Sequence, residues 1–192
     1  MSLLRFKSLA LASALAMGSL AAQAATTVLT EGFDSVPAAL ASGWVETNLS
    51  APGGSTGWYQ GETSAFTALS GADDSYVAAN FNNALPGDAI QNWLITPQFT
   101  LSSLAKLVFS TRTDDGSTYS DRLEVRYNAS GSTNTADCTE LLFTINDTEA
   151  SGGYVDAWTE FSATFGGWGD HGRIAFVYSV SDSDLANYIG ID

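Results

Sequence analysis

Apolar and polar residues alternate along much of this chain, with the period of two that is typical of β-strands buried on one face. In the segment 106–113, Leu107, Phe109 and Thr111 share one face, while Val108 and Ser110 share the other. The predicted strands are residues 27–33, 43–48, 57–60, 76–80, 92–95, 99–101, 106–113, 121–128, 139–145, 158–165, 173–179 and 188–191. One helical turn is expected at residues 36–40.

Glycine, proline and Asx residues separate these strands in short clusters, as in residues 51–55, 85–88, 113–117 and 128–132. Such residues supply positive φ angles and local side-chain hydrogen bonds, and so form tight turns. Many short strands joined in this way predict an all-β fold, a two-sheet antiparallel β-sandwich of the jelly-roll type.

The N-terminal residues have the pattern of a secretory signal peptide. Arg5 and Lys7 precede an apolar segment at residues 9–20, and Ala22-Gln23-Ala24 gives the small-x-small cleavage pattern. We therefore predict a signal peptide at residues 1–24 and one exported domain at residues 25–192. No other apolar segment is long enough to span a bilayer, so direct membrane insertion is not expected.

At the other end, residues 188–191 alternate as a strand does, and the sequence stops at Asp192 with no turn or cap. We expect the domain to be truncated here, with the natural strand continuing beyond Asp192.

Charge and cysteine content narrow the functional classes. The sequence has 7 Lys and Arg residues against 21 Asp and Glu residues, a net charge of −14. Removing Arg5 and Lys7 with the signal leaves 5 against 21, or −16. Such a charge disfavours nucleic acids and anionic lipids as partners. Cys138 is the only cysteine, and its acidic surroundings make it a poor nucleophile.

Several short motifs follow one another in a fixed order. They are Glu31-Gly32-Phe33-Asp34, Gly43-Trp44, Gly57-Trp58-Tyr59-Gln60-Gly61, residues 76–82, Asn92-Trp93-Leu94-Ile95-Thr96-Pro97, residues 121–126 and Tyr188-Ile189-Gly190-Ile191-Asp192. In this order they resemble the choice-of-anchor J domains, which are grouped with the cleaved-adhesin and MAM-like modules of bacterial surface proteins. The resemblance covers essentially the whole chain after the signal.

That resemblance implies a galactose-binding-like sandwich that serves as a secreted or surface-displayed binding module. Such modules often precede a C-terminal sorting anchor, commonly of the PEP-CTERM kind, and no such anchor occurs within residues 1–192. The family also implies a structural calcium ion where the first and last strands meet. Matched to this sequence, its ligands are Glu31, Asp34 and Asp192. The alternative is that these three are solvated acids at strand ends.

Aromatic residues near glycine-rich loops are the candidate ligand contacts, because exposed rings stack on sugars and anchor peptides. We predict Trp58, Tyr59 and Trp168 for this role, although Trp58 and Trp168 also suit a core position. The remaining tryptophans lie in patterned strands and are expected in the core: Trp44, Trp93 and Trp158.

No catalytic motif is visible. His171 is the only histidine, and neither a Gly-x-Ser-x-Gly nor a His-Glu-x-x-His motif occurs. Asp114, Asp115 and Asp121 flank one turn, which suits a solvated hairpin better than a cation site. We therefore predict a non-catalytic adhesion module whose partner is an extracellular glycan or surface protein. A purely structural envelope protein and a hydrolase are the alternatives.

Overall fold

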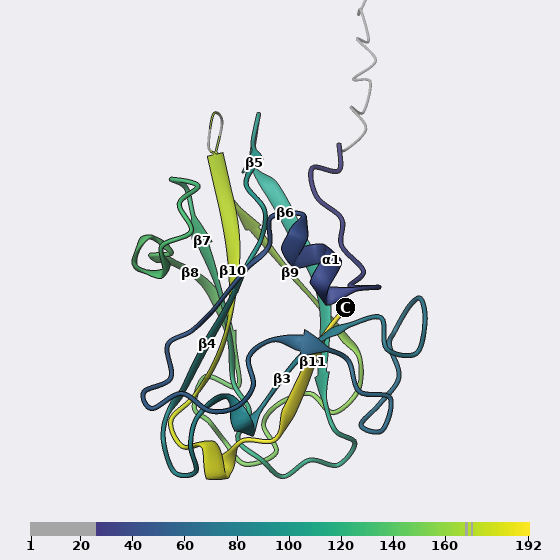
Figure 1. Ribbon diagram of the computed structural model, residues 1–192. Helices are drawn as coiled ribbons and strands as arrows, with labels where there is room; N and C mark the ends of the chain where they lie inside the picture. The colour runs from purple at the N-terminus through teal and green to yellow at the C-terminus, as the bar shows by residue number, and fades with distance from the viewer. Residues whose placement is uncertain (1–25, 168, 170) are drawn as a thin grey trace, which may run out of the picture.

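Two antiparallel β-sheets face each other in the computed structural model, which describes residues 26–167, 169 and 171–192 (Figure 1). The first sheet runs through β1 (Val45–Asn48), β4 (Ile90–Ile95), β10 (His171–Val180), β7 (Leu123–Asn128) and β8 (Glu140–Ile145), and β5 (Phe99–Thr100) pairs with β10 beside this path. The second runs through β2 (Tyr59–Gln60), β3 (Val77–Asn80), β11 (Tyr188–Ile191), β6 (Ala105–Thr113) and β9 (Thr159–Phe165). The predicted all-β, jelly-roll-type sandwich is confirmed.

The main core lies between the sheets and is built by the predicted alternation. On β7, Leu123, Val125 and Tyr127 are almost fully buried, while the residues between them are half-buried on the outer face. Phe109 of β6 packs edge-on against Phe176 of β10, with ring centroids 5.0 Å apart across the sandwich. Full burial of each such side chain stabilises the fold by roughly 1.5–3 kcal/mol.

The outer face of the first sheet is also covered, at its centre. Ile95, Ala175 and Val177 point away from the main core and are nevertheless buried. The connection between β7 and β8, which contains the short helix η2 (Thr135–Asp137), places Cys138 against them. This explains why β10 is apolar on both faces, as a central strand covered on both sides must be.

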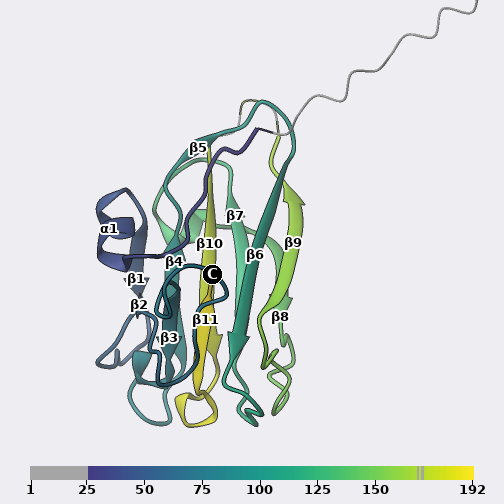
Figure 2. The ribbon, with the colours of Figure 1, turned by 90° about the vertical axis from the view of Figure 1, so that its right-hand side faces the viewer.

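Two local predictions have opposite outcomes. The helical turn is present as α1 (Val36–Ala41), where the side chain of Ser35 caps the N-terminus by accepting from Ala38 N–H and Pro37 occupies the first turn. The strand predicted at residues 27–33 is wrong, because that segment lies beside the second sheet without joining it (Figure 2). Short helices η1 (Phe81–Asn83) and η3 (Ser183–Leu185) complete the fold.

No helix in the described ranges is long and apolar enough to cross a membrane. The predicted signal peptide, residues 1–24, lies outside the described residues.

Candidate functional site

The corner where the predicted calcium ligands lie is formed by the segment before α1 and the end of β11. Glu31 uses one carboxylate oxygen, Oε1, to accept hydrogen bonds from the N–H groups of Gly32 (3.1 Å) and Phe33 (2.9 Å). Phe33 adopts a positive φ of 49°, and its buried ring packs against Trp44. The carboxylate thus satisfies two N–H groups that a strand would pair with a neighbour, so the chain turns here instead of extending.

Asp34 and Asp192 both hold the connection between β2 and β3, residues 61–76. Asp34 Oδ1 accepts from the Ser75 hydroxyl at 2.7 Å. Asp192 Oδ2 accepts from the N–H groups of Leu69 at 2.9 Å and Ser70 at 3.0 Å. Burial raises the pKa of Asp192, the two N–H donors lower it, and the negative charge of Asp34 raises it. The two carboxylates therefore lie close enough to repel each other.

The three predicted ligands gather at one corner but do not form a three-carboxylate cluster. Glu31 and Asp192 line the same pocket, whose volume is about 220 Å³; Asp34 does not line it, although its negative charge raises the pKa of Asp192. Within the described ranges, no three Asp, Glu, His or Cys side chains are grouped closely enough to hold a metal ion. One oxygen of each carboxylate is engaged by an N–H or O–H donor. Two carboxylates at one pocket fit a hard cation only if main-chain oxygens complete its shell.

The predicted ligand-contact residues are dispersed. The prediction for Trp58 is wrong: its side chain is 3% exposed and belongs to the main core. Glu46 of β1 accepts a hydrogen bond of 2.9 Å from the main-chain N–H of Trp58. This bond fixes Trp58 against the first sheet, with its ring in the main core. Tyr59 is half-buried, and its hydroxyl accepts from the Asn80 amide at 2.7 Å. Trp168 lies outside the described residues.

Of the tryptophans expected in the core, Trp44 and Trp93 are buried, and Trp158 is only half-buried. Trp158 belongs to an aromatic cluster on the outer face of the second sheet, under the connection 61–76. Its ring contacts Phe66 and Tyr76 edge-on, and its indole N–H donates to the Thr67 carbonyl at 2.9 Å. Sequence reasoning missed this cluster, although Tyr76, just before β3, and Tyr188, on the outward side of β11, are too large and apolar to be left in solvent.

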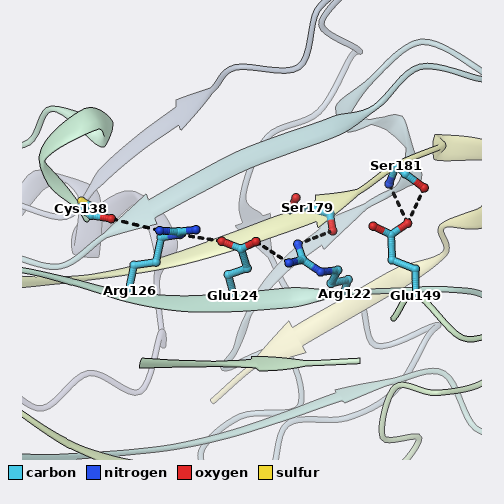
Figure 3. A network of polar contacts seen from close by, with 7 residues as sticks. All are labelled: Arg122, Glu124, Arg126, Cys138, Glu149, Ser179 and Ser181. Carbon is cyan, nitrogen blue, oxygen red and sulfur yellow. Dashed lines mark hydrogen bonds and ion pairs between the residues drawn. The ribbon is translucent and has the colours of Figure 1, made fainter. Parts of the chain in front are cut away.

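The outer face of the first sheet carries a row of three charged side chains, from Arg122 just before β7 and from Glu124 and Arg126 on β7, shown in Figure 3. Glu124 binds Arg122 through Oε1 at 2.5 Å and Arg126 through Oε2 at 2.6 Å. Arg126 also donates to the carbonyl of Cys138 at 3.5 Å. Both carboxylate oxygens are therefore occupied, and the row helps to hold the β7–β8 connection on the sheet.

Comparison with known proteins gives a likeness of fold. No protein-family model matches the chain, and no curated protein matches it. Among solved structures, the K1 cleaved adhesin domain of Lys-gingipain from Porphyromonas gingivalis W83 aligns with a TM-score of 0.61 at 20% identity, covering 87% of this chain and 95% of that domain. This chain has a cleaved-adhesin-like fold.

Two further domains of the same protein agree. The K3 cleaved adhesin domain aligns with a TM-score of 0.58 at 18% identity, covering 86% of this chain and 95% of that domain. The K2 domain gives 0.55 at 22% identity, covering 85% and 94%. At these identities the likeness concerns the cleaved-adhesin-like fold alone.

Within this fold, the histidine and the cysteine of the sequence lie in different surroundings. His171 is exposed, and its Nδ1 lies 3.1 Å from the hydroxyl of Thr100. Cys138 is 2% exposed, and burial raises the pKa of its thiol. The charge of Asp137 adds to this rise, while Asn128 and the charges of Arg126 and Arg173 lower the pKa of the thiol.

The acidic turn contains a feature that the sequence did not reveal. Asp115 is exposed, as a hairpin turn predicts, but Asp121 is 0% exposed. Its Oδ1 accepts from the Tyr178 hydroxyl at 2.6 Å and from the Asn187 N–H at 2.9 Å. Burial raises the pKa of Asp121 to about 6, against the lowering effect of these donors, and the charge of Asp114 adds to the rise. Asp121 is a structural acid of the interior.

Proposed function

We propose that this protein is an exported, non-catalytic binding module that attaches to a partner outside the cell. The observation that carries the proposal is the cleaved-adhesin-like fold, which extends over 85–87% of the chain in three comparisons. The buried Cys138, whose thiol pKa is raised by burial, is consistent with a role that needs no chemistry. Export follows from the signal-peptide pattern at residues 1–24.

As partner we favour a surface protein over a glycan. Carbohydrate binding was predicted from exposed rings, and Trp58 offers none because it lies in the core. Tyr59 is half-buried beside β3 and is, of the two members of that set that the structure describes, the one placed to contact a ligand. A single half-buried tyrosine is a weak platform for sugar stacking, whereas protein interfaces use such residues within larger surfaces.

Binding assays on protein-coated surfaces and on a glycan array test this choice. We expect saturable binding to one or more bacterial surface or matrix proteins and none to glycans. Tyr59→Ala should weaken that binding if this face is used, while Tyr59→Phe, which keeps the ring, should not. Saturable binding to a glycan would contradict the choice of a protein partner and favour a sugar ligand. Absence of binding to every surface would refute the proposal that the protein is a binding module.

We also propose a structural calcium ion at the corner formed by Glu31, Asp34 and Asp192. The support is chemical: hard carboxylate oxygens on a chain with a large negative charge, two of them lining one pocket. An ion present at 100 times its dissociation constant would add about 2.7 kcal/mol to the free energy of unfolding. EDTA should therefore lower the melting temperature, and calcium should restore it in the wild type but not in Glu31→Gln. An unchanged melt would exclude the ion.

A further inference from the structure

Four large apolar side chains, each between 44 and 50% exposed, lie at one end of the sandwich. They are Phe81, Leu85, Tyr119 and Leu185. They belong to three connections, from β3 to β4 (residues 81–89), from β6 to β7 (residues 114–122) and from β10 to β11 (residues 181–187). Figure 1 shows these connections at the lower end of the molecule, around the short helix η3 in yellow. This surface is named the η3 rim.

Hydrogen bonds between the connections place Leu185 at the centre of the η3 rim. The N–H of Ser120, which follows Tyr119, donates to the Leu185 carbonyl at 2.7 Å. On the other side, the Ser183 hydroxyl donates to the Leu85 carbonyl at 2.8 Å. Tyr119 and Leu85 therefore flank the connection that carries Leu185, and the exposed side chains form one surface.

The connection from β3 to β4 is fixed to the same place at two further points. The N–H of Phe81 donates to the Asn187 carbonyl at 2.9 Å, and the N–H of Ser183 donates to the Asp88 carbonyl at 2.9 Å. Loops held in this way are pre-organised, so binding a partner requires little further ordering. A contiguous apolar surface on such loops is typical of an interaction site, whereas isolated exposed apolar residues are ordinary.

The charges of the η3 rim are negative. Its three connections contain five aspartates besides the interior Asp121, namely Asp88, Asp114, Asp115, Asp182 and Asp184. Arg122 is the one basic residue in these connections, and Glu124 binds it on the outer face of the first sheet. The η3 rim therefore combines exposed apolar side chains with negative charge that no basic residue of the same connections is free to neutralise.

This combination selects among the possible partners. A second copy of the chain, with its net charge of −14, or an anionic membrane would bring like charge to the aspartates. Leucine side chains pack against apolar groups of proteins but offer no ring face to a sugar. A protein surface that carries apolar side chains among lysines and arginines complements both features of the rim.

We infer that the η3 rim is a docking surface for a basic partner protein. Apolar side chains of the partner pack on the exposed residues around Leu185, and its lysines or arginines pair with the aspartates of the rim. The inference rests on the proposed function, because it assigns a surface and a class of partner to the binding module. The surface is formed by internal connections of the chain alone.

A labelled peptide of sequence Lys-Leu-Lys-Trp-Leu-Lys is a suitable probe, since it carries both features of such a partner. Fluorescence anisotropy with the full chain should show saturable binding, at least about fivefold weaker when the salt concentration rises from about 0.05 to about 0.5 M. One control peptide has serine in place of leucine and tryptophan, and a second has glutamate in place of lysine. Both should bind at least about tenfold more weakly, and equal binding by either would overturn the inference.

Matched variants of the protein locate the binding. Leu185→Ser should weaken peptide binding about fivefold, whereas Leu104→Ser, at a leucine exposed where β6 begins at the other end of the sandwich, should not change it (Figure 2). Asp184→Asn should weaken binding about twofold, and Asp73→Asn, at an exposed acid of another connection, should not. All four positions are exposed, so the variants should fold. Equal binding by Leu185→Ser and Leu104→Ser would overturn the inference.

Other occupants of the η3 rim are recognised by two further measurements. Sedimentation of the wild type without peptide should show a monomer, and self-association that Leu185→Ser abolishes would overturn the inference in favour of a second copy. A glycan array should show no binding through the rim, and glycan binding that Leu185→Ser abolishes would overturn the inference in favour of a sugar.

Binding to bacterial surface or matrix proteins separates this inference from the proposed function. Leu185→Ser should weaken that binding about fivefold, and Leu104→Ser should leave it unchanged. Surface-protein binding that is unaffected by Leu185→Ser would refute the docking surface and leave the binding module intact. Peptide binding at the rim without any surface partner would refute the module and leave the docking surface.

Discussion

Replacing Asp121 by asparagine should remove a specific part of the pH dependence of folding. The hydroxyl of Thr113 lies 2.7 Å from the Tyr188 carbonyl and 3.0 Å from Asp121 Oδ2. A carbonyl only accepts, so the single hydroxyl hydrogen belongs to that contact. Asp121 Oδ2 then needs a proton of its own to bond to Thr113. The site is therefore built for a neutral side chain at position 121.

The magnitude follows from the pKa of Asp121, which burial raises from 3.8 to about 6. A raised pKa means that folding favours the protonated acid, so this group stabilises the fold most at low pH and loses that effect as the pH rises through 6. At about 1.4 kcal/mol per pKa unit, the loss between pH 4 and pH 8 is about 2–3 kcal/mol. An asparagine side chain can donate to the Thr113 hydroxyl at every pH, so the variant avoids this loss of stability.

Urea unfolding of both proteins at pH 4 and pH 8 measures this difference. The variant should match the wild type within about 1 kcal/mol at pH 4 and exceed it by about 2–3 kcal/mol at pH 8. Asp115→Asn removes the same charge from an exposed position of the same turn, and should leave the pH profile in place. A variant that follows the wild-type profile from pH 4 to pH 8 would refute the reasoning.

Three further predictions concern packing and reactivity. Gly54→Ala should destabilise the fold by roughly 1–3 kcal/mol, because the added Cβ would lie 1.9 Å from the main-chain oxygen of Asn82; a melting temperature unchanged by this variant would contradict that close approach. Glu124→Gln should lower the free energy of unfolding by about 1–2 kcal/mol at pH 7, measured by urea unfolding. Burial raises the pKa of Glu124, but its arginine partners lower it by more. The wild type therefore loses the stabilising ion pairs when Glu124 is protonated, so the difference between the two proteins should shrink as the pH falls. Cys138 should react with a thiol reagent only after unfolding, and rapid modification of the native protein would show that its burial is not maintained.

The strands were predictable because a period of two reports burial directly. Leu123, Val125 and Tyr127 alternate with charged neighbours, and the sandwich buries that face. The helical turn was predictable for a similarly local reason, since Ser35 and Pro37 suit a helix N-terminus.

What the sequence left open depends on contacts between distant residues. Residues 27–33 alternate like a strand, but Glu31 bonds to the N–H groups that a strand would pair, and this preference cannot be read from the pattern. Trp58 looked exposed because glycines surround it, whereas a carboxylate on β1 fixes it against the core. In the sequence, Asp121 resembles the other acids of its turn. Its burial depends on distant residues, since the Tyr178 hydroxyl and the Asn187 N–H donate to its carboxylate.

The order of strands places the two latest elements at the centre of the molecule. β10 is the middle strand of the first sheet and β11 the middle strand of the second. Everything synthesised earlier, from β1 to β9, forms the halves that these two strands join. Because such long-range pairings must close before they are rewarded, folding should be slow and should wait until β10 and β11 have both been synthesised. Neither sheet can therefore be completed before its central strand is available.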